Sequence, residues 1–78
     1  MPSPHEVRDR MLKRLKQARK EARLSQTLVA ERLGGWTKTA VSKIERGERE
    51  LQAAELWEFA QLYGKSMDWF FNESEDNS

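Results

Sequence analysis

The chain of 78 residues contains no cysteine, so no disulfide bond can stabilise it and no cysteine can act as a nucleophile. The lack of cysteine fits a reducing compartment. No apolar run approaches the roughly 20 residues that a membrane-spanning helix needs. The first residues also lack the apolar core of a secretion signal. We therefore expect a soluble, cytoplasmic protein that makes no contact with a membrane.

The parts of common catalytic sites are also missing. The chain has one histidine, His5, and a lone imidazole without a partner in the sequence makes neither a metal site nor a catalytic site. It has only four glycines, and no glycine-rich phosphate-binding loop occurs. The closely spaced acids Glu45, Glu48 and Glu50 are better explained by solvation of a helix end and a loop than by catalysis. We predict no enzymatic activity, no metal, no cofactor and no small-molecule ligand.

What the chain does contain is an uneven distribution of charge. Residues 1–49 carry 13 Lys/Arg against 6 Asp/Glu, a balance of +7, whereas residues 50–78 carry 1 Lys against 7 acids, a balance of −6. A sign change of this size within one small chain indicates a basic working face and an acidic remainder. Nucleic acid is then a candidate partner, although charges that merely solvate exposed helix faces would give the same count.

Helix-start and helix-stop residues divide the chain into predicted helices, and no segment has a strand pattern. Apolar residues recur at spacings of three and four, which is typical of helices that pack one face on a core. Ser or Thr precedes most of the segments as an N-cap, and glycine follows three of them. The predicted helices cover residues 4–22, 25–34, 37–46, 53–63 and 67–72. We therefore predict a compact, all-α, five-helix domain over residues 1–72, followed by a disordered acidic tail at residues 73–78.

The second and third predicted helices are short, and a tight turn with Gly34 and Gly35 joins them. This arrangement is typical of a helix-turn-helix, whose second helix enters the major groove of DNA. The third helix, residues 37–46, has no acid before Glu45. Its outward residues are all hydrogen-bond donors, namely Lys38, Thr39, Ser42 and Lys43. The sequence thus predicts a DNA-reading face, with a plain solvated face of a helical bundle as the alternative.

Two stretches of sequence resemble a known family. Residues 24–34, LSQTLVAERLG, and residues 37–47, TKTAVSKIERG, are similar to the lambda-repressor/Cro (Xre-type) family of DNA-binding domains. The similarity continues through Leu56, Ala60 and Gly64 and covers about residues 10–71. The resemblance implies a lambda-repressor-like fold that binds double-stranded DNA.

The resemblance also implies roles for individual residues. The implied DNA-contacting set is Gln26, Lys38, Thr39, Ser42, Lys43, Arg46 and Arg49, to which we add Thr37, the cap of the third helix. Within this set, Gln26 corresponds to a glutamine that contacts a phosphate and braces the recognition helix, while Arg46 and Arg49 lie in a loop that grips the DNA backbone. Arg19 and Glu45 match a partly buried ion pair that ties the first helix to the end of the third.

The sequence departs from the family pattern at four places. The turn holds two glycines, Gly34 and Gly35, where one is usual, so the orientation of the third helix can differ from that in the family. Trp36 replaces a smaller apolar residue. Glu48 stands where a basic or small residue is common and weakens the local positive field. Leu51 stands where proline is frequent. These departures affect the detailed contacts rather than the motif.

The aromatic residues near the C-terminus predict a partner surface. Trp69, Phe70 and Phe71 cannot all face one core from a short helix, and we expect Phe70 to be the buried one. An exposed apolar patch on so small a protein suggests a partner. The residues that we assign to a dimer interface are Leu51, Trp57, Trp69 and Phe71. The simpler alternative is that Trp57 and Trp69 only pack on long side chains nearby.

These observations together predict a sequence-specific transcriptional regulator that acts as a homodimer on a palindromic operator. Controllers of restriction–modification systems and small phage or plasmid repressors share this size, and the sequence does not distinguish repression from activation. The alternative from another class is a protein-interaction module, such as an antitoxin, whose aromatic patch binds a different protein.

Overall fold

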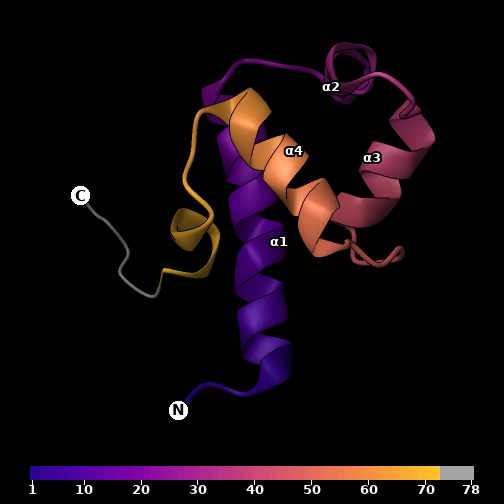
Figure 1. Ribbon diagram of the computed structural model, residues 1–78. Coiled ribbons are helices and arrows are strands. Elements are labelled where there is room, and N and C mark those ends of the chain that lie inside the picture. The colour runs from indigo at the N-terminus through magenta and orange to yellow at the C-terminus, as the bar shows by residue number, and fades with distance from the viewer. Residues whose placement is uncertain (73–78) are drawn as a thin grey trace.

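The computed structural model describes residues 1–72, which form four α-helices and one short 3₁₀ helix (Figure 1). The elements are α1 (Pro4–Glu21), α2 (Gln26–Leu33), α3 (Lys38–Glu45), α4 (Ala53–Tyr63) and the 3₁₀ helix η1 (Asp68–Phe71). Residues 1–72 contain no strand, so the all-α prediction is confirmed. The predicted acidic tail, residues 73–78, lies outside the described residues.

The predicted fifth α-helix at residues 67–72 is wrong in type, because the chain forms a single 3₁₀ turn there. The backbone N–H groups of Trp69 and Phe70 each donate to a carbonyl three residues back, at 3.2 Å. One turn gains too few bonds between residues four apart to offset the cost of starting an α-helix, whereas 3₁₀ geometry suits short pieces. The domain therefore has four α-helices rather than five.

The helix starts follow from side chains that satisfy free backbone N–H groups. Before α1, the Ser3 Oγ accepts from the Glu6 N–H at 3.2 Å, and the Glu6 carboxylate accepts from the Ser3 N–H at 2.8 Å. The side chains of Ser25 and Thr37 each accept from an N–H three residues on, at 3.1 and 3.0 Å. These bonds place the first residues of α1, α2 and α3 where the capping residues predict them.

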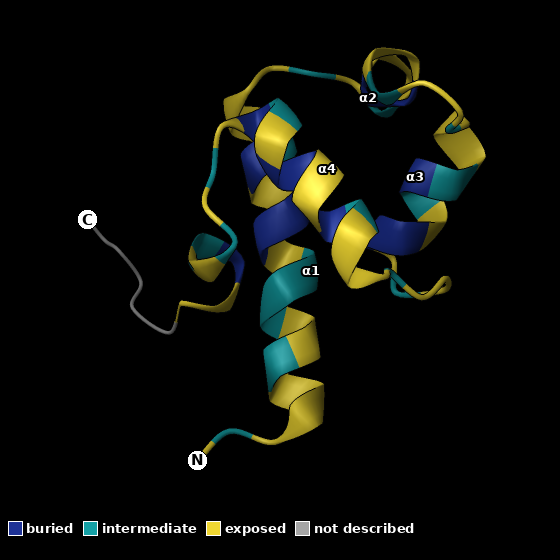
Figure 2. Ribbon diagram, viewed as in Figure 1, coloured by how far each residue is buried: buried dark blue, intermediate teal, exposed yellow. Residues whose placement is uncertain are grey.

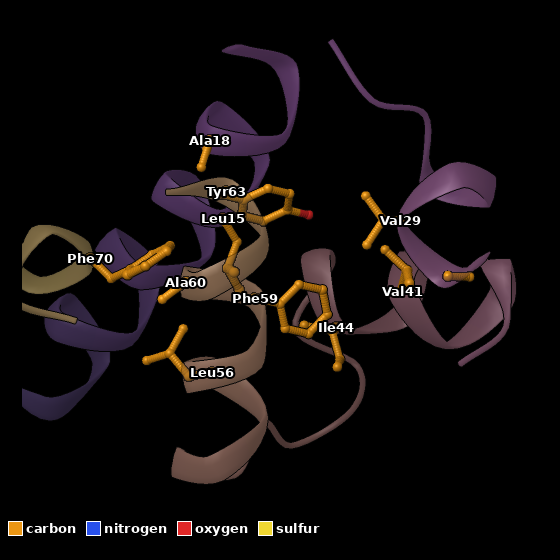
Figure 3. Packing of buried hydrophobic residues seen from close by; sticks show 11 residues of the cluster. Leu15, Ala18, Val29, Val41, Ile44, Leu56, Phe59, Ala60, Tyr63 and Phe70 are labelled. Atoms are coloured by element: carbon orange, nitrogen blue, oxygen red, sulfur yellow. The ribbon is translucent and has the colours of Figure 1, made fainter. Parts of the chain in front are cut away.

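One hydrophobic core joins all five elements (Figure 3). Its buried members are Leu15, Ala18, Val29, Ala30, Val41, Ile44, Leu56, Phe59, Ala60, Tyr63 and Phe70. Phe70 is fully buried, as its place in the aromatic run predicts. The Trp36 ring meets the Phe59 ring edge-on, with centroids 5.1 Å apart, so the turn before α3 packs directly on α4.

Helix α1 is the longest element, and its two halves have different surroundings. Its C-terminal half packs within the bundle, whereas its N-terminal half extends beyond α4 (Figure 1). Exposed and half-buried residues cover this extended half (Figure 2). The contacts of α1 with η1, α3 and α4 make it the support on which the helix-turn-helix is mounted.

Candidate nucleic-acid interface

Helices α2 and α3 pack against each other through Val29 and Val41, which are both fully buried. The turn between them contains Gly34 and Gly35, whose φ angles are 71° and 74°. These left-handed backbone conformations are costly for residues with a Cβ, so both positions of the lengthened turn favour glycine. The extra glycine therefore allows the turn to lead into α3 without strain.

Helix α3 buries one face and leaves the other to solvent. Val41, Ile44 and Glu45 are buried. The side chains on the other face belong to the predicted DNA-contacting set, with Thr37, Lys38, Thr39, Lys43 and Arg46 exposed and Ser42 half-buried. Every one of them can donate a hydrogen bond. The face that sequence patterning assigns to DNA is thus accessible along the whole helix.

The orientation of α3 is fixed by an ion pair at its last residue. Arg19 donates to both carboxylate oxygens of Glu45, from Nε at 2.7 Å and from the terminal nitrogen Nη2 at 3.1 Å. The Arg19 and Glu45 side chains are only 12% and 3% exposed. The hydrogen bond to Glu45 raises the pKa of Arg19 above its ordinary value. Arg19 also donates to the Leu24 carbonyl at 3.1 Å, which joins the pair to the link between α1 and α2.

Gln26 lies at the start of α2 and joins the same network. Its Nε2 donates to the Glu45 Oε1 at 3.0 Å, so the side chain connects the start of α2 to the end of α3. This contact braces the end of α3 from the start of α2, and the phosphate contact of Gln26 stays a prediction. Three elements therefore meet at one buried carboxylate, and Glu45 is the residue through which α3 is held.

The two loop arginines of the predicted set are paired with carboxylates in the free protein. Arg46 donates from Nε and Nη2 to the two oxygens of Glu48, both at 3.0 Å. This mutual hydrogen bonding raises the pKa of Arg46 and lowers that of Glu48. Arg49 donates to Glu55 at 3.2 Å, and its guanidinium lies over the Trp36 ring, 4.7 Å from the centroid. A phosphate would have to compete with these partners.

Sequence reasoning missed one residue that supports α3. Arg8, near the start of α1, donates to the Gly47 carbonyl at 2.5 Å. A Cβ on Gly47 would lie 3.0 Å from both the Arg8 guanidinium and the Leu12 side chain. Glycine at position 47 is therefore required by this close approach as well as by its φ of 76°. No local pattern could indicate a contact between residues 39 positions apart.

A family model described as helix-turn-helix matches residues 15–70, from within α1 to η1. The chain belongs to the lambda-repressor/Xre-type helix-turn-helix family. It is accordingly a DNA-binding helix-turn-helix protein. Neither the curated proteins nor the solved structures gave a match. The matched region starts in the middle of α1, so Arg8 and the extended half of that helix lie outside it.

The four residues assigned to a dimer interface are spread over three places on this helix-turn-helix domain. Leu51 and Phe71 line one groove together with Met11 of α1. Trp57, which is 54% exposed, lies beside a different hollow, between α2 and α4. Trp69 is only partly buried, with Arg14 and Lys65 over its ring at 4.7 and 4.4 Å from the centroid. The structure therefore does not bring the four into one patch.

No helix among residues 1–72 is both long and apolar enough to cross a membrane. Within the same residues, no group of histidine, cysteine or acidic side chains has an arrangement that could hold a metal ion.

Proposed function

We propose that this helix-turn-helix protein is a sequence-specific transcriptional regulator, without catalytic activity, that inserts α3 into the major groove of double-stranded DNA. The observation that carries the proposal is the outer face of α3, where only donor side chains are exposed on a helix whose last residue is anchored by Arg19 and Gln26. A rigidly held row of donors suits base edges rich in acceptors. A regulator that binds chromosomal or plasmid DNA acts in the cytoplasm, so the proposal includes a cytoplasmic location.

The residues divide into two roles in this proposal. Lys38, Thr39, Ser42 and Lys43 read base edges, where lysine is matched to the O6 and N7 acceptors of guanine. The phosphate contacts come from Gln26, Thr37, Arg46 and Arg49, and they position the helix without reading sequence. Because each phosphate contact releases counterions, affinity should fall steeply as salt rises.

A homodimer is part of the proposal because one recognition helix reads only a few base pairs. Two copies related by a two-fold axis would present two copies of α3 about 34 Å apart, one turn of DNA, on an approximate palindrome. The groove lined by Leu51 and Phe71 is our choice of interface, because two of the four assigned residues meet there along an apolar stretch of α1. Phe71 is 39% exposed in the single chain, so a second copy could bury it.

Selection of bound sites from a pool of random duplexes tests the proposed function. We expect enrichment of an approximate palindrome with half-sites about 10 bp, or a multiple of this, apart. The matched control is the Lys38→Ala/Lys43→Ala double variant, which keeps the buried network and should enrich no sequence. Failure of the wild-type protein to bind any duplex from low to physiological salt would refute the proposal.

A protein-interaction module, such as an antitoxin, is the second candidate function. The observation that favours it is Trp57, a large exposed side chain that lies away from the groove of Leu51 and Phe71. Co-purification from the native host separates the two readings. A single protein species supports the homodimeric regulator, whereas a stoichiometric second protein that is lost in Trp57→Ala supports the interaction module.

A further inference from the structure

At the end of α3, every nitrogen of the Arg46 guanidinium has a partner within the protein. Nε and Nη2 each donate to one carboxylate oxygen of Glu48 at 3.0 Å, which forms a two-pronged pair. The remaining nitrogen, Nη1, donates to the Ser42 Oγ. Glu48 thus holds the Arg46 side chain against α3, where it contacts Ser42 of the proposed base-reading face.

We infer that Glu48 is a specificity-determining residue that lowers binding to random DNA by occupying Arg46 and sets Ser42 as a donor towards the bases. The inference rests on the proposed function and assigns a new role to a residue outside the expected contact set. Glu48 acts through Arg46 and is therefore a positioning residue.

One effect of Glu48 is on phosphate binding by Arg46. An arginine fork fits a carboxylate and a phosphate in the same two-pronged way, so Glu48 and a DNA phosphate compete for one group. The two side chains are 53% and 54% exposed. Exposed ion pairs of this kind are weak in water, so Glu48 reduces the phosphate contact of Arg46 without abolishing it. Contacts to phosphate carry no sequence information, so the reduction falls on binding that is independent of sequence.

A second effect of Glu48, through Arg46, is on the direction of the Ser42 hydroxyl. A serine hydroxyl has one hydrogen to donate and lone pairs that accept. Because the Ser42 oxygen accepts from Arg46, its own hydrogen has to point elsewhere. Ser42 lies one turn after Lys38 on the same side of α3, so a donated hydrogen suits an acceptor such as a purine N7 or a thymine O4. A free serine hydroxyl can pair with either a donor or an acceptor on a base edge. With Arg46 fixed by Glu48, Ser42 would instead select base edges that carry an acceptor.

Glu48→Gln tests the inference because it keeps the size of the side chain and removes its charge. On a random-sequence duplex, we expect tighter binding than wild type and a steeper salt dependence. One full phosphate contact adds about 0.9 to the logarithmic salt slope, so the advantage of the variant should fall by up to about 3.5-fold between about 50 and about 200 mM salt. Glu50→Gln is the matched control, because it makes the same change of charge two residues away in the same loop.

A third variant assigns the effect to Arg46. In the Arg46→Ala background, Glu48→Gln should change the random-duplex salt slope no more than Glu50→Gln does. Site selection supplies the specificity readout, in which Glu48→Gln and Ser42→Ala should lose preference at the same base pair. Equal affinities and salt slopes for Glu48→Gln and Glu50→Gln on the random duplex would overturn the inference while leaving DNA binding intact. If wild type binds no duplex, the proposed function itself fails.

Discussion

The Nε atom of Arg19 lies 2.7 Å from the Oε2 of Glu45, which ties the C-terminal half of α1 to the last residue of α3. The Glu45 carboxylate is nearly sealed from solvent, and it also accepts from Gln26. A helix held at one buried charge keeps a defined angle to the rest of the domain. Burial without partners would instead force the carboxylate to lose its charge or the helix to move.

We expect Arg19→Ala and Glu45→Ala each to lower the free energy of unfolding by about 3 kcal/mol, because each leaves the other charge buried and unpaired. Chemical denaturation measures both losses. The double alanine variant should cost less than the sum of the single losses, since no charge is stranded. Glu21→Ala, which breaks the exposed pair of Glu21 with Lys65, is the control and should cost far less than either single variant. Additive losses in the Arg19 and Glu45 cycle would contradict this prediction.

Tyr63→Phe should leave stability unchanged or raise it by roughly 1 kcal/mol. The Tyr63 side chain is buried in the core (Figure 3), and its hydroxyl has no hydrogen-bond partner among the described residues. An unsatisfied buried hydroxyl costs free energy that phenylalanine does not incur. Thermal and chemical unfolding measure the change, and Tyr63→Leu, which removes ring packing, should destabilise. A loss of more than about 1 kcal/mol in Tyr63→Phe would show that the hydroxyl is bonded.

The same pair of proteins should differ in alkaline solution. Burial raises the pKa of Tyr63 well above its ordinary value, and the Glu45 charge adds to the rise. The unfolded chain therefore loses this proton first, from about pH 10, and stability declines as pH rises further. Below that pH the contribution is constant. The measured quantity is the free energy of unfolding of wild type minus that of Tyr63→Phe, which cancels the titration of all other groups. This difference should become more unfavourable to wild type above about pH 10. A flat difference would contradict the assignment.

Gly47→Ala should destabilise the domain by more than Gly64→Ala does. Both glycines have a positive φ, at 76° and 70°, so each substitution introduces backbone strain of roughly 1 kcal/mol. At Gly64 an added Cβ meets no atom within 4 Å, whereas at Gly47 it meets Arg8 and Leu12 at 3.0 Å. The excess loss in Gly47→Ala should shrink in an Arg8→Ala background, which opens the space. Equal losses at the two glycines would mean that Arg8 does not clamp the end of α3.

Lys38→Ala and Lys43→Ala should each cost about 1–3 kcal/mol of binding to the selected site. Their cost on a random duplex should be smaller, because base contacts are lost only where the bases match. Lys13→Ala, at an exposed position of α1, removes the same charge and is the control. Titrations of both duplexes at one salt concentration give the ratios. Equal costs on the selected and the random duplex would reassign Lys38 and Lys43 to the DNA backbone.

Phe71→Ser should shift the protein from dimer towards monomer, because it removes an apolar ring from the groove shared with Leu51. Sedimentation at tens of micromolar, checked by circular dichroism for intact helices, measures the shift. Trp57→Ser is the comparison, since it removes a large exposed side chain on another face. A shift with Trp57→Ser alone would move the interface to the α2–α4 side, and a monomeric wild type on DNA would refute the dimer.

The sequence by itself determined the elements whose causes are local. The capping residues Ser3, Ser25 and Thr37 predict the starts of three helices, because a cap bonds to an N–H only three residues away. The spacing of apolar residues likewise predicts which face of each helix is buried. The ion pair of Arg19 with Glu45 could be predicted in another way, because it follows from resemblance to a family in which matching residues form such a pair.

Tertiary structure alone decided the relations between distant segments. Arg8 reaches Gly47 because α1 extends past the end of α3, and no residue near either position carries that information. Leu51 and Phe71 line one groove while Trp57 lies elsewhere, because helix orientation rather than residue type sets the neighbours of an exposed side chain. Phe70 of η1 is buried because η1 packs against α1, a segment far away in the sequence. Local bonds can be inferred along the chain, whereas packing depends on how the whole core closes.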